Sequence, residues 1–361
     1  MSRAVIVLFV GLIVSACTAP ASPSASQVPA TPLPSQAASA DPTTSPSSEA
    51  ADPTSSPSLG WTGHPAEGLA VVHQTDAEDP TTQVFIVEAD GSERQVTGLS
   101  NALGASNPTW SPDGSQLAFN DPAVGSGIFG QVAVVNADGS DERKLAEGRE
   151  AQWSPDGSRI VFWESDPIGD EETSMFLLDM ATETVTDIGV GGSPRWLPDG
   201  ERISFVRTLT AADGAITTAL HVMPVTGGEA ELIAEETTAY WSPDGSAVLL
   251  EHDGVLSLAE VDFSGPRDLV NGFSPVWAPD GQSFVFAYDH DADANPLLAV
   301  ADLDGTTLWS GVPGSLPTWS PDGTRLAVEV YRPETPVIQV IEVASGTVVY
   351  ELEGRQPAWR P

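Results

Sequence analysis

A short tryptophan motif recurs along most of this chain and restricts the folds open to it. Trp-x-Pro-Asp-Gly begins at six positions, and the chain ends in a partial copy, Trp359-Arg360-Pro361. The seven tryptophans are Trp110, Trp153, Trp196, Trp241, Trp277, Trp319 and Trp359, spaced 43, 43, 45, 36, 42 and 40 residues apart. A unit of about 40–45 residues cannot bury its own apolar faces and must stack on its neighbours. The period predicts a β-propeller, in which these tryptophans pack between blades.

Each unit has the pattern of four short strands. In the unit that contains Trp110, apolar runs at 108–110, 117–119, 132–135 and 143–145 are separated by Gly, Pro and Asp, which is typical of strands. Ser-Pro-Asp-Gly suits a type I turn, with Pro at the second position and Gly at the fourth. Leu197 and Ala278 replace the serine in two units, whereas Pro, Asp and Gly recur in all six. We therefore interpret the turn aspartates as structural rather than catalytic.

The two ends of the repeat region complement each other. Residues 67–71 match the turn and the start of the second strand of a unit, but no first strand precedes them. Residues 356–361 match the first strand of a unit, but no second strand follows them. We expect the last strand to complete the first blade, which would pair two exposed edges. The sequence thus predicts an all-β, seven-bladed propeller closed by N- and C-terminal strands in one blade. Six blades are the alternative if the short unit between Trp241 and Trp277 is degenerate.

The six motifs resemble the repeats of the TolB-type, WD-repeat-like propeller family. The resemblance covers about residues 61–361 and implies the propeller fold for that part of the chain. It implies little about function, because a fold of this kind hosts many activities. Periplasmic scaffolds, sensors, peptidase side domains and some lyases all belong to this broad family.

The N-terminus has the features of an export signal. Arg3 precedes an apolar run of 11 residues, Ala4–Val14, which is shorter than the roughly 20 residues needed to span a bilayer. The run ends in Val14-Ser15-Ala16-Cys17, which resembles the bacterial lipobox, and Cys17 is the sole cysteine. The resemblance implies that residues 1–16 are a lipoprotein signal peptide and that Cys17 carries the lipid, on the extracytoplasmic side of the cell membrane. A plain secretory signal is the alternative.

Residues 17–60 are rich in Ala, Ser, Pro and Thr. Such a segment has too little apolar surface to offset its chain entropy, so we expect a disordered tether before the propeller at 61–361.

The charge balance excludes one class of partner. The chain has 14 Lys and Arg against 51 Asp and Glu, a net charge of -37. A nucleic-acid surface needs clustered basic residues, so we expect no nucleic-acid partner. The charge favours a dispersed monomer; a cationic partner or a divalent metal is the alternative. The membrane should be contacted only through the lipid on Cys17.

The connections within each unit predict two unequal faces. The Pro-Asp-Gly turns and the Asp-Gly hairpins share one face, whereas longer, irregular loops at 74–82, 121–130, 165–174, 208–218 and 289–296 share the other. Unequal insertions on one face often mark the binding face, so we expect a partner to dock there. Alignment of the second strands places a ring of residues at this face: His73, Asp121, Glu164, Arg207, His252, Tyr288 and Val330.

Two metal hypotheses follow from this region. Some propeller lyases of the broad family hold a metal at the channel mouth mainly through histidines. This resemblance implies that His73 and His252, with Glu164 or Asp121, bind a divalent metal or a polar ligand, and His290 beside the ring is a further metal candidate. Asp289, Asp291 and Asp293 alternate as calcium ligands do, but Ala294 stands where a calcium loop needs Gly. Solvated strand ends and an acidic surface loop are the alternatives, and we expect no cofactor.

These features favour a lipid-anchored scaffold that binds an envelope protein or surface ligand without catalysis. A metal-dependent, carbohydrate-active propeller and a structural or sensory envelope lipoprotein are the alternatives. No catalytic motif is found in the sequence.

Overall fold

The computed structural model describes residues 63–74, 81–98, 104–122, 130–164, 173–210, 216–291 and 295–361. They belong to a unit that runs from Trp61 to Pro361; Met1–Gly60 form a separate unit. The predicted signal peptide, the Cys17 anchor and the tether at 17–60 lie outside the described residues.

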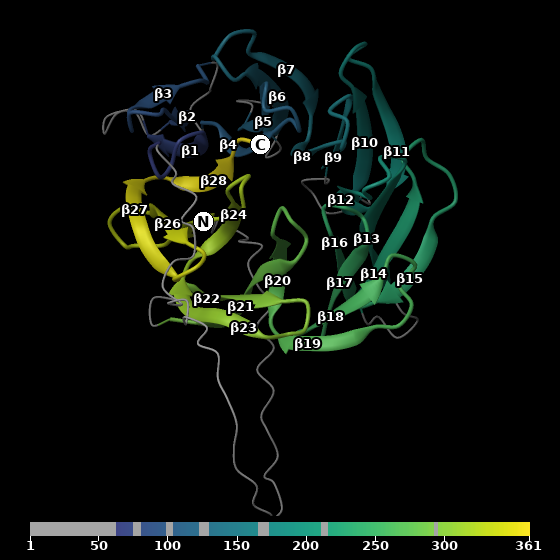
Figure 1. Ribbon diagram of the computed structural model, residues 1–361. Coiled ribbons are helices and arrows are strands. Elements are labelled where there is room, and N and C mark those ends of the chain that lie inside the picture. The colour runs from purple at the N-terminus through teal and green to yellow at the C-terminus, as the bar shows by residue number, and fades with distance from the viewer. Residues whose placement is uncertain are drawn as a thin grey trace, which may run out of the picture. The chain divides into compact units, whose positions relative to one another are not determined.

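Seven four-stranded antiparallel sheets are arranged around an axis, one sheet per repeat (Figure 1). Blade 1 contains β28 (Arg355–Trp359), β1 (Leu69–Gln74), β2 (Thr82–Val87) and β3 (Glu93–Gln95). Blade 2 contains β4 (Ser106–Trp110), β5 (Gln116–Pro122), β6 (Gly130–Asn136) and β7 (Arg143–Glu147). Blade 3 contains β8 (Arg149–Trp153), β9 (Arg159–Glu164), β10 (Ser174–Asp179) and β11 (Val185–Val190).

The other four blades repeat this order from the inner strand outwards. Blade 4 contains β12 (Gly192–Trp196), β13 (Arg202–Thr210), β14 (Ile216–Pro224) and β15 (Glu231–Glu235). Blade 5 contains β16 (Thr237–Trp241), β17 (Ala247–His252), β18 (Val255–Glu260) and β19 (Arg267–Asn271). Blade 6 contains β20 (Phe273–Trp277), β21 (Ser283–His290), β22 (Pro296–Asp302) and β23 (Thr307–Pro313). Blade 7 contains β24 (Ser315–Trp319), β25 (Arg325–Val330), β26 (Val337–Glu342) and β27 (Thr347–Glu353).

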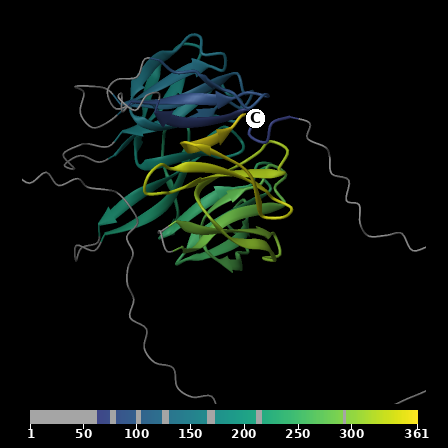
Figure 2. The ribbon, with the colours of Figure 1, turned by 90° about the vertical axis from the view of Figure 1, so that its left-hand side faces the viewer.

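The structure confirms the seven-bladed prediction, including its closure. β28 pairs antiparallel with β1, with Leu69 opposite Trp359 and Ala70 opposite Ala358. Figure 2 shows the blades edge-on, with the C-terminus at one face. The short unit forms a complete blade 5, so the six-bladed alternative is wrong.

The hydrophobic core is divided among the blade interfaces. Each of the seven apolar clusters joins residues of two adjacent blades. Phe119, Phe162, Phe205 and Phe284 are among the largest fully buried side chains. Each blade therefore depends on both neighbours for burial, as the period predicts.

The tryptophans that end the inner strands also join blades by hydrogen bonds. The Trp153 indole N–H donates to the Thr109 carbonyl at 3.2 Å, one blade back. The same bond recurs from Trp110 to Ala358, Trp196 to Gln152, Trp277 to Tyr240 and Trp319 to Val276. These tryptophans pack between blades as predicted, and five of them also donate an indole N–H hydrogen bond to the preceding blade.

The Pro-Asp-Gly turns have the predicted structural role. The Gly114 N–H donates to the Ser111 carbonyl at 2.8 Å, and Gly114 has φ of 66°. Asp113 accepts hydrogen bonds from the Ser111 hydroxyl at 2.6 Å and from the backbone N–H of Ser115 at 3.0 Å. The hydrogen bond from the Ser111 hydroxyl, together with the bonds from Ser115, lowers the pKa of Asp113 from 3.8 to about 2. The carboxylate is therefore occupied within its own turn.

No helix in the described part of the chain is long and apolar enough to cross a bilayer.

Candidate functional site

A bulge near the start of the inner strand is repeated around the axis. Six inner strands carry a left-handed residue at their second position, with φ between 48° and 54°. These residues are Asn107, Glu150, Ser193, Ser274, Leu316 and Gln356, each three positions before the repeat tryptophan. In all six strands the pairing with the next strand shifts register at this place. A bulge of this kind redirects a side chain and ends regular pairing.

Polar side chains of the preceding blade hold four of these bulges. Each accepts a hydrogen bond from the backbone N–H of a left-handed residue. The bonds run from Asn107 to Gln356 Oε1 at 2.7 Å, Glu150 to Asn120 Oδ1 at 3.2 Å, Ser274 to Glu251 Oε2 at 2.8 Å and Gln356 to Glu329 Oε2 at 2.9 Å. A strained backbone persists where its surroundings fix it, and such positions cluster at ligand sites.

Blade 5 departs from this pattern. Its left-handed residue, Glu236 at φ 51°, precedes β16, and β16 pairs with β17 without a register shift. β17 and β18 are joined by a two-residue hairpin at Asp253 and Gly254, with φ of 50° and 73°. Positive φ at both central residues is the type I′ arrangement. This tight connection explains the short spacing of 36 residues between Trp241 and Trp277.

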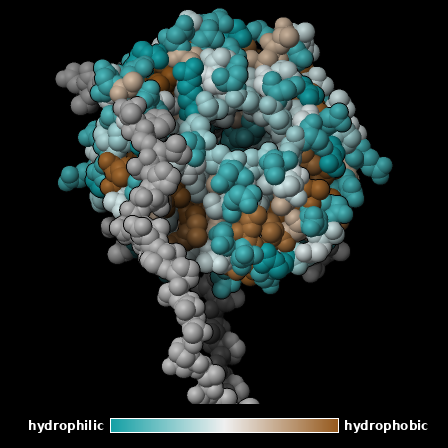
Figure 3. All heavy atoms as spheres, in the orientation of Figure 1, coloured by the Kyte–Doolittle hydropathy of each residue, from teal (hydrophilic) through white to brown (hydrophobic). Residues whose placement is uncertain are grey.

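A cavity of about 450 Å³ lies among the inner strands of blades 7, 1, 2 and 3. Figure 3 shows the face at which the C-terminus lies (Figure 2), hollowed near its centre, with hydrophilic residues around the hollow. Side chains from the bulges and from the strands below them line the cavity: Asn107, Thr109, Glu150, Gln152, Leu316, Thr318 and Gln356. Carboxamides, hydroxyls and one carboxylate thus surround a space large enough for a small ligand or a peptide side chain.

An aromatic contact between blades 4 and 5 fixes two further inner-strand side chains. The Arg195 guanidinium lies 5.3 Å from the centroid of the Tyr240 ring, and the Tyr240 hydroxyl donates to Glu251 Oε2 at 3.0 Å. Burial, with the nearby charge of Glu251, raises the pKa of Tyr240 above its ordinary value of 10.0. The hydroxyl therefore stays protonated and keeps Glu251 in place for its bond to Ser274.

Two residues of the predicted ring are engaged within their own blades. Asp121 is 1% exposed and forms an ion pair with Lys144 of β7. The His73 ring stacks on Phe85 at 3.8 Å, and its Nε2 lies 2.7 Å from Glu93 Oε2. Both residues contact outer strands of blades 2 and 1.

The other predicted ring residues have separate surroundings. His252 is exposed, with its Nε2 3.3 Å from Asp253, and Tyr288 is 38% exposed. Arg207 donates to the Val190 carbonyl at 2.9 Å, Glu164 is half-buried, and Val330 is buried. No function of these residues is tested, so their role in binding stays a prediction.

The metal candidates among the described residues do not form a cluster. Within the described ranges, no three His, Cys, Asp or Glu side chains come together as metal ligands. Asp293 lies outside the described residues. Asp291 Oδ1 accepts the Asn295 N–H at 2.8 Å, and Asn295 Oδ1 accepts the Tyr331 N–H at 2.7 Å. These bonds connect the loop after β21 to blade 7.

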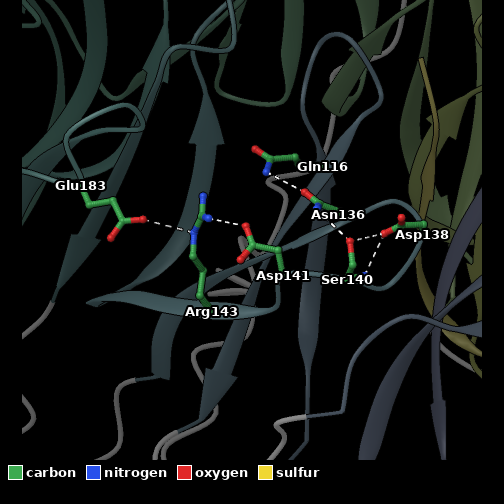
Figure 4. A network of polar contacts seen from close by, with 7 residues as sticks. All are labelled: Gln116, Asn136, Asp138, Ser140, Asp141, Arg143 and Glu183. Carbon is green, nitrogen blue, oxygen red and sulfur yellow. Dashed lines mark hydrogen bonds and ion pairs between the residues drawn. The ribbon is translucent and has the colours of Figure 1, made fainter.

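The hairpin at the outer edge of blade 2 shows how surface acids are used (Figure 4). Asp138 accepts bonds from the backbone N–H and hydroxyl of Ser140 at 2.9 and 2.6 Å. Arg143 forms ion pairs with Asp141 and with Glu183 of blade 3, the latter at 3.3 Å. These acids hold turns and join blades.

Sequence reasoning missed the residues that border the cavity. The predicted ring lies one position after Asn120, Glu251 and Glu329 on the second strands. Successive strand residues point to opposite faces, so the residues that reach the bulges are the earlier ones. The usable signal is the position three before each tryptophan, which is followed by Pro in five of the seven repeats.

Several solved structures share this architecture. TolB from Acinetobacter baumannii matches at a TM-score of 0.51 and 18% identity, over 81% of this chain and 66% of that one. The chain has the TolB propeller fold. An oligogalacturonate lyase in complex with manganese matches this TolB-type propeller at a TM-score of 0.52 and 17% identity, over 78% of this chain and 85% of that one. An oligogalacturonate lyase from Vibrio parahaemolyticus matches at a TM-score of 0.56 and 15% sequence identity, over 80% of this chain and 86% of that one.

Identities this low establish the fold alone. No protein-family model matches the sequence, and no curated protein matches it either. The chain spans 66% of the length of the matched TolB.

Proposed function

We propose that this chain is an extracytoplasmic, lipid-anchored propeller that binds a partner as a scaffold and performs no catalysis. The central cavity carries the proposal, because polar side chains of the inner strands line it, including those of Asn107, Glu150 and Gln356 at the repeated bulges. The bulges lie towards the face of the longer connections, where the sequence predicts docking, and the cavity lining continues to Trp110, Trp359 and Pro361 at the opposite end of the inner strands. The Val14-Ser15-Ala16-Cys17 segment supports the anchor.

A photo-cross-linking amino acid at the cavity mouth tests the binding role. Leu316 lines the cavity and is 54% exposed, so a cross-linker there should give a discrete adduct in intact cells. Leu308, on the outer strand β23, is 56% exposed and is the matched control. The same adducts at both positions, or none at position 316, would contradict the proposal.

The anchor is tested separately. Cys17→Ser should release the protein from the membrane fraction and abolish incorporation of a labelled fatty acid, because the thiol is the proposed attachment atom. Membrane retention by this variant would contradict lipid anchoring at Cys17.

The fold shared with two oligogalacturonate lyases favours a second candidate, a metal-dependent carbohydrate-active enzyme. It makes a distinct prediction: the purified chain should cleave oligogalacturonate when Mn²⁺ is added, and His73→Ala with His252→Ala should abolish cleavage. The absence of product from the unaltered chain would leave the scaffold as the function.

A further inference from the structure

Glu150 is the single charged side chain among the described residues that line the cavity. It occupies the bulge of β8 at φ 54°, and its backbone N–H is held by Asn120 of the preceding blade. The bulge therefore fixes the backbone from which the Glu150 side chain extends at the cavity lining.

The Glu150 carboxylate is oriented but not neutralised. Its Oε2 accepts the indole N–H of Trp163 at 3.1 Å, and no ion pair joins it to a cation in the described ranges. The neighbouring cation, Arg149, lies over the face of the same indole ring, 4.0 Å from the centroid. Trp163 thus contacts both charged groups, and Oε1 of Glu150 keeps its capacity to accept a bond.

Most basic side chains in the described ranges are used inside the fold. Lys144, Arg94, Arg143, Arg202 and Arg332 form ion pairs with acidic side chains. Others donate to backbone carbonyls, as from Arg159 to Gly200, Arg207 to Val190 and Arg267 to Leu303. With a net charge of -37, the field of the chain attracts cations, and a cleft concentrates that field.

Two carboxamides complete the chemistry around Glu150. Within the described part of the chain, the side chains of Asn107 and Gln152 make no hydrogen bond, and both line the cavity. Each offers one acceptor and two donors, which suits the backbone of a peptide.

We infer that Glu150 anchors a lysine ammonium or arginine guanidinium group of the partner, held in the cavity beside Asn107 and Gln152. This inference rests on the proposed binding function and specifies the chemistry of the group that enters. An anionic ligand would meet an unpaired carboxylate and no cation in the cavity lining.

A matched pair of peptides tests the inference on the full chain. N-acetyl-Ala-Lys-Ala-amide and its Nε-acetyl-lysine counterpart differ by one charge. Titrations are followed by the NMR signal of the Trp163 indole N–H, which bonds to Glu150. The lysine peptide should shift this signal saturably and bind about tenfold more tightly than the acetylated one, as for a hydrogen bond to a charged group.

Glu150→Gln keeps the shape of the side chain and removes its charge. It should weaken binding of the lysine peptide about tenfold. Glu231→Gln removes the same charge on the exposed outer strand β15 and should change binding less than about twofold, because only the screened field changes.

Equal affinity of the two peptides, or equal losses in the two variants, would overturn the inference. That outcome leaves the cross-link at position 316 to decide the scaffold function on its own. Conversely, binding of the lysine peptide through Glu150 without an adduct at position 316 would reject the scaffold function and would leave only a cavity that binds cationic side chains.

Discussion

Trp359 in the last strand lies opposite Leu69 in the first strand, and this pairing closes the ring of seven blades. Both side chains are buried in the cluster between blades 7 and 1. The Ala358 carbonyl also accepts the indole N–H of Trp110 at 3.1 Å. One five-residue strand thus contacts three blades.

Removal of this strand should destabilise the whole propeller. Deletion of residues 355–361 leaves β1 unpaired on its inner edge, and Trp359→Ala should cost about 3–5 kcal/mol through lost burial. Urea unfolding followed by circular dichroism measures both variants against the exposed substitution Glu353→Gln. An unchanged midpoint in the deletion variant would show that closure contributes nothing to stability.

The indole bonds between blades should contribute measurably. Trp153→Phe removes the bond to the Thr109 carbonyl and should cost about 1–3 kcal/mol, because an acceptor is left without its donor. Trp241 is half-buried as Trp153 is, but in the described ranges its indole N–H makes no bond of this kind. Trp241→Phe is therefore the control and should cost less. Equal losses in the free energy of unfolding would assign the effect to packing alone.

The turn aspartates predict a pH dependence of stability. The hydrogen bond from the Ser154 hydroxyl, together with the bonds from Ser158, lowers the pKa of Asp156 from 3.8 to about 2. Because the folded pKa is depressed, its stabilisation is present above about pH 4 and is lost as the pH falls towards 2. Asp156→Asn should therefore be less stable than the unaltered chain at pH 7, and the difference should shrink between pH 4 and 2.

The turn at Asp280 supplies the control for this measurement. Ala278 replaces the serine there, and the carboxylate accepts the Gln282 N–H at 2.9 Å. Asp280→Asn should give a smaller loss at pH 7. A loss from Asp156→Asn that is constant between pH 7 and 2 would contradict the role assigned to its charge.

The buried ion pair in blade 2 should be sensitive to loss of its cation. Lys144→Met leaves the carboxylate of Asp121, 1% exposed, without a partner and should cost about 3 kcal/mol or more. Arg332→Met breaks the ion pair with Glu351, whose side chains are 45% and 38% exposed, and should cost about 1 kcal/mol or less. Equal thermal unfolding midpoints for the two variants would contradict the assigned difference.

The repeat predicted the fold because its signals are local. Turn chemistry at Pro-Asp-Gly, the period of the tryptophans and the complementary ends each depend on short stretches of sequence. The cavity could not be read in this way. Whether Asp121 or Asn120 faces the next blade depends on the register of β5 against β4, which the bulge at Asn107 shifts.

Glu150 illustrates what remains hidden in the sequence. It is one of 51 acidic residues, and nothing in its immediate neighbours distinguishes it from the acids that hold turns. Its position in the cavity follows from contacts with Asn120 and Trp163 on β5 and β9. Such contacts between strands distant along the chain require the three-dimensional arrangement.

At the bulge three residues before six of the seven repeat tryptophans, the backbone shape does not depend on the identity of the side chain. Six strands adopt almost the same φ there while carrying Asn, Glu, Ser, Ser, Leu and Gln. Because the architecture tolerates this variety, new specificities could arise by substitution at these positions, leaving the rest of each blade intact. A combinatorial library limited to this ring would therefore offer a route to engineered receptors on a scaffold that needs no redesign.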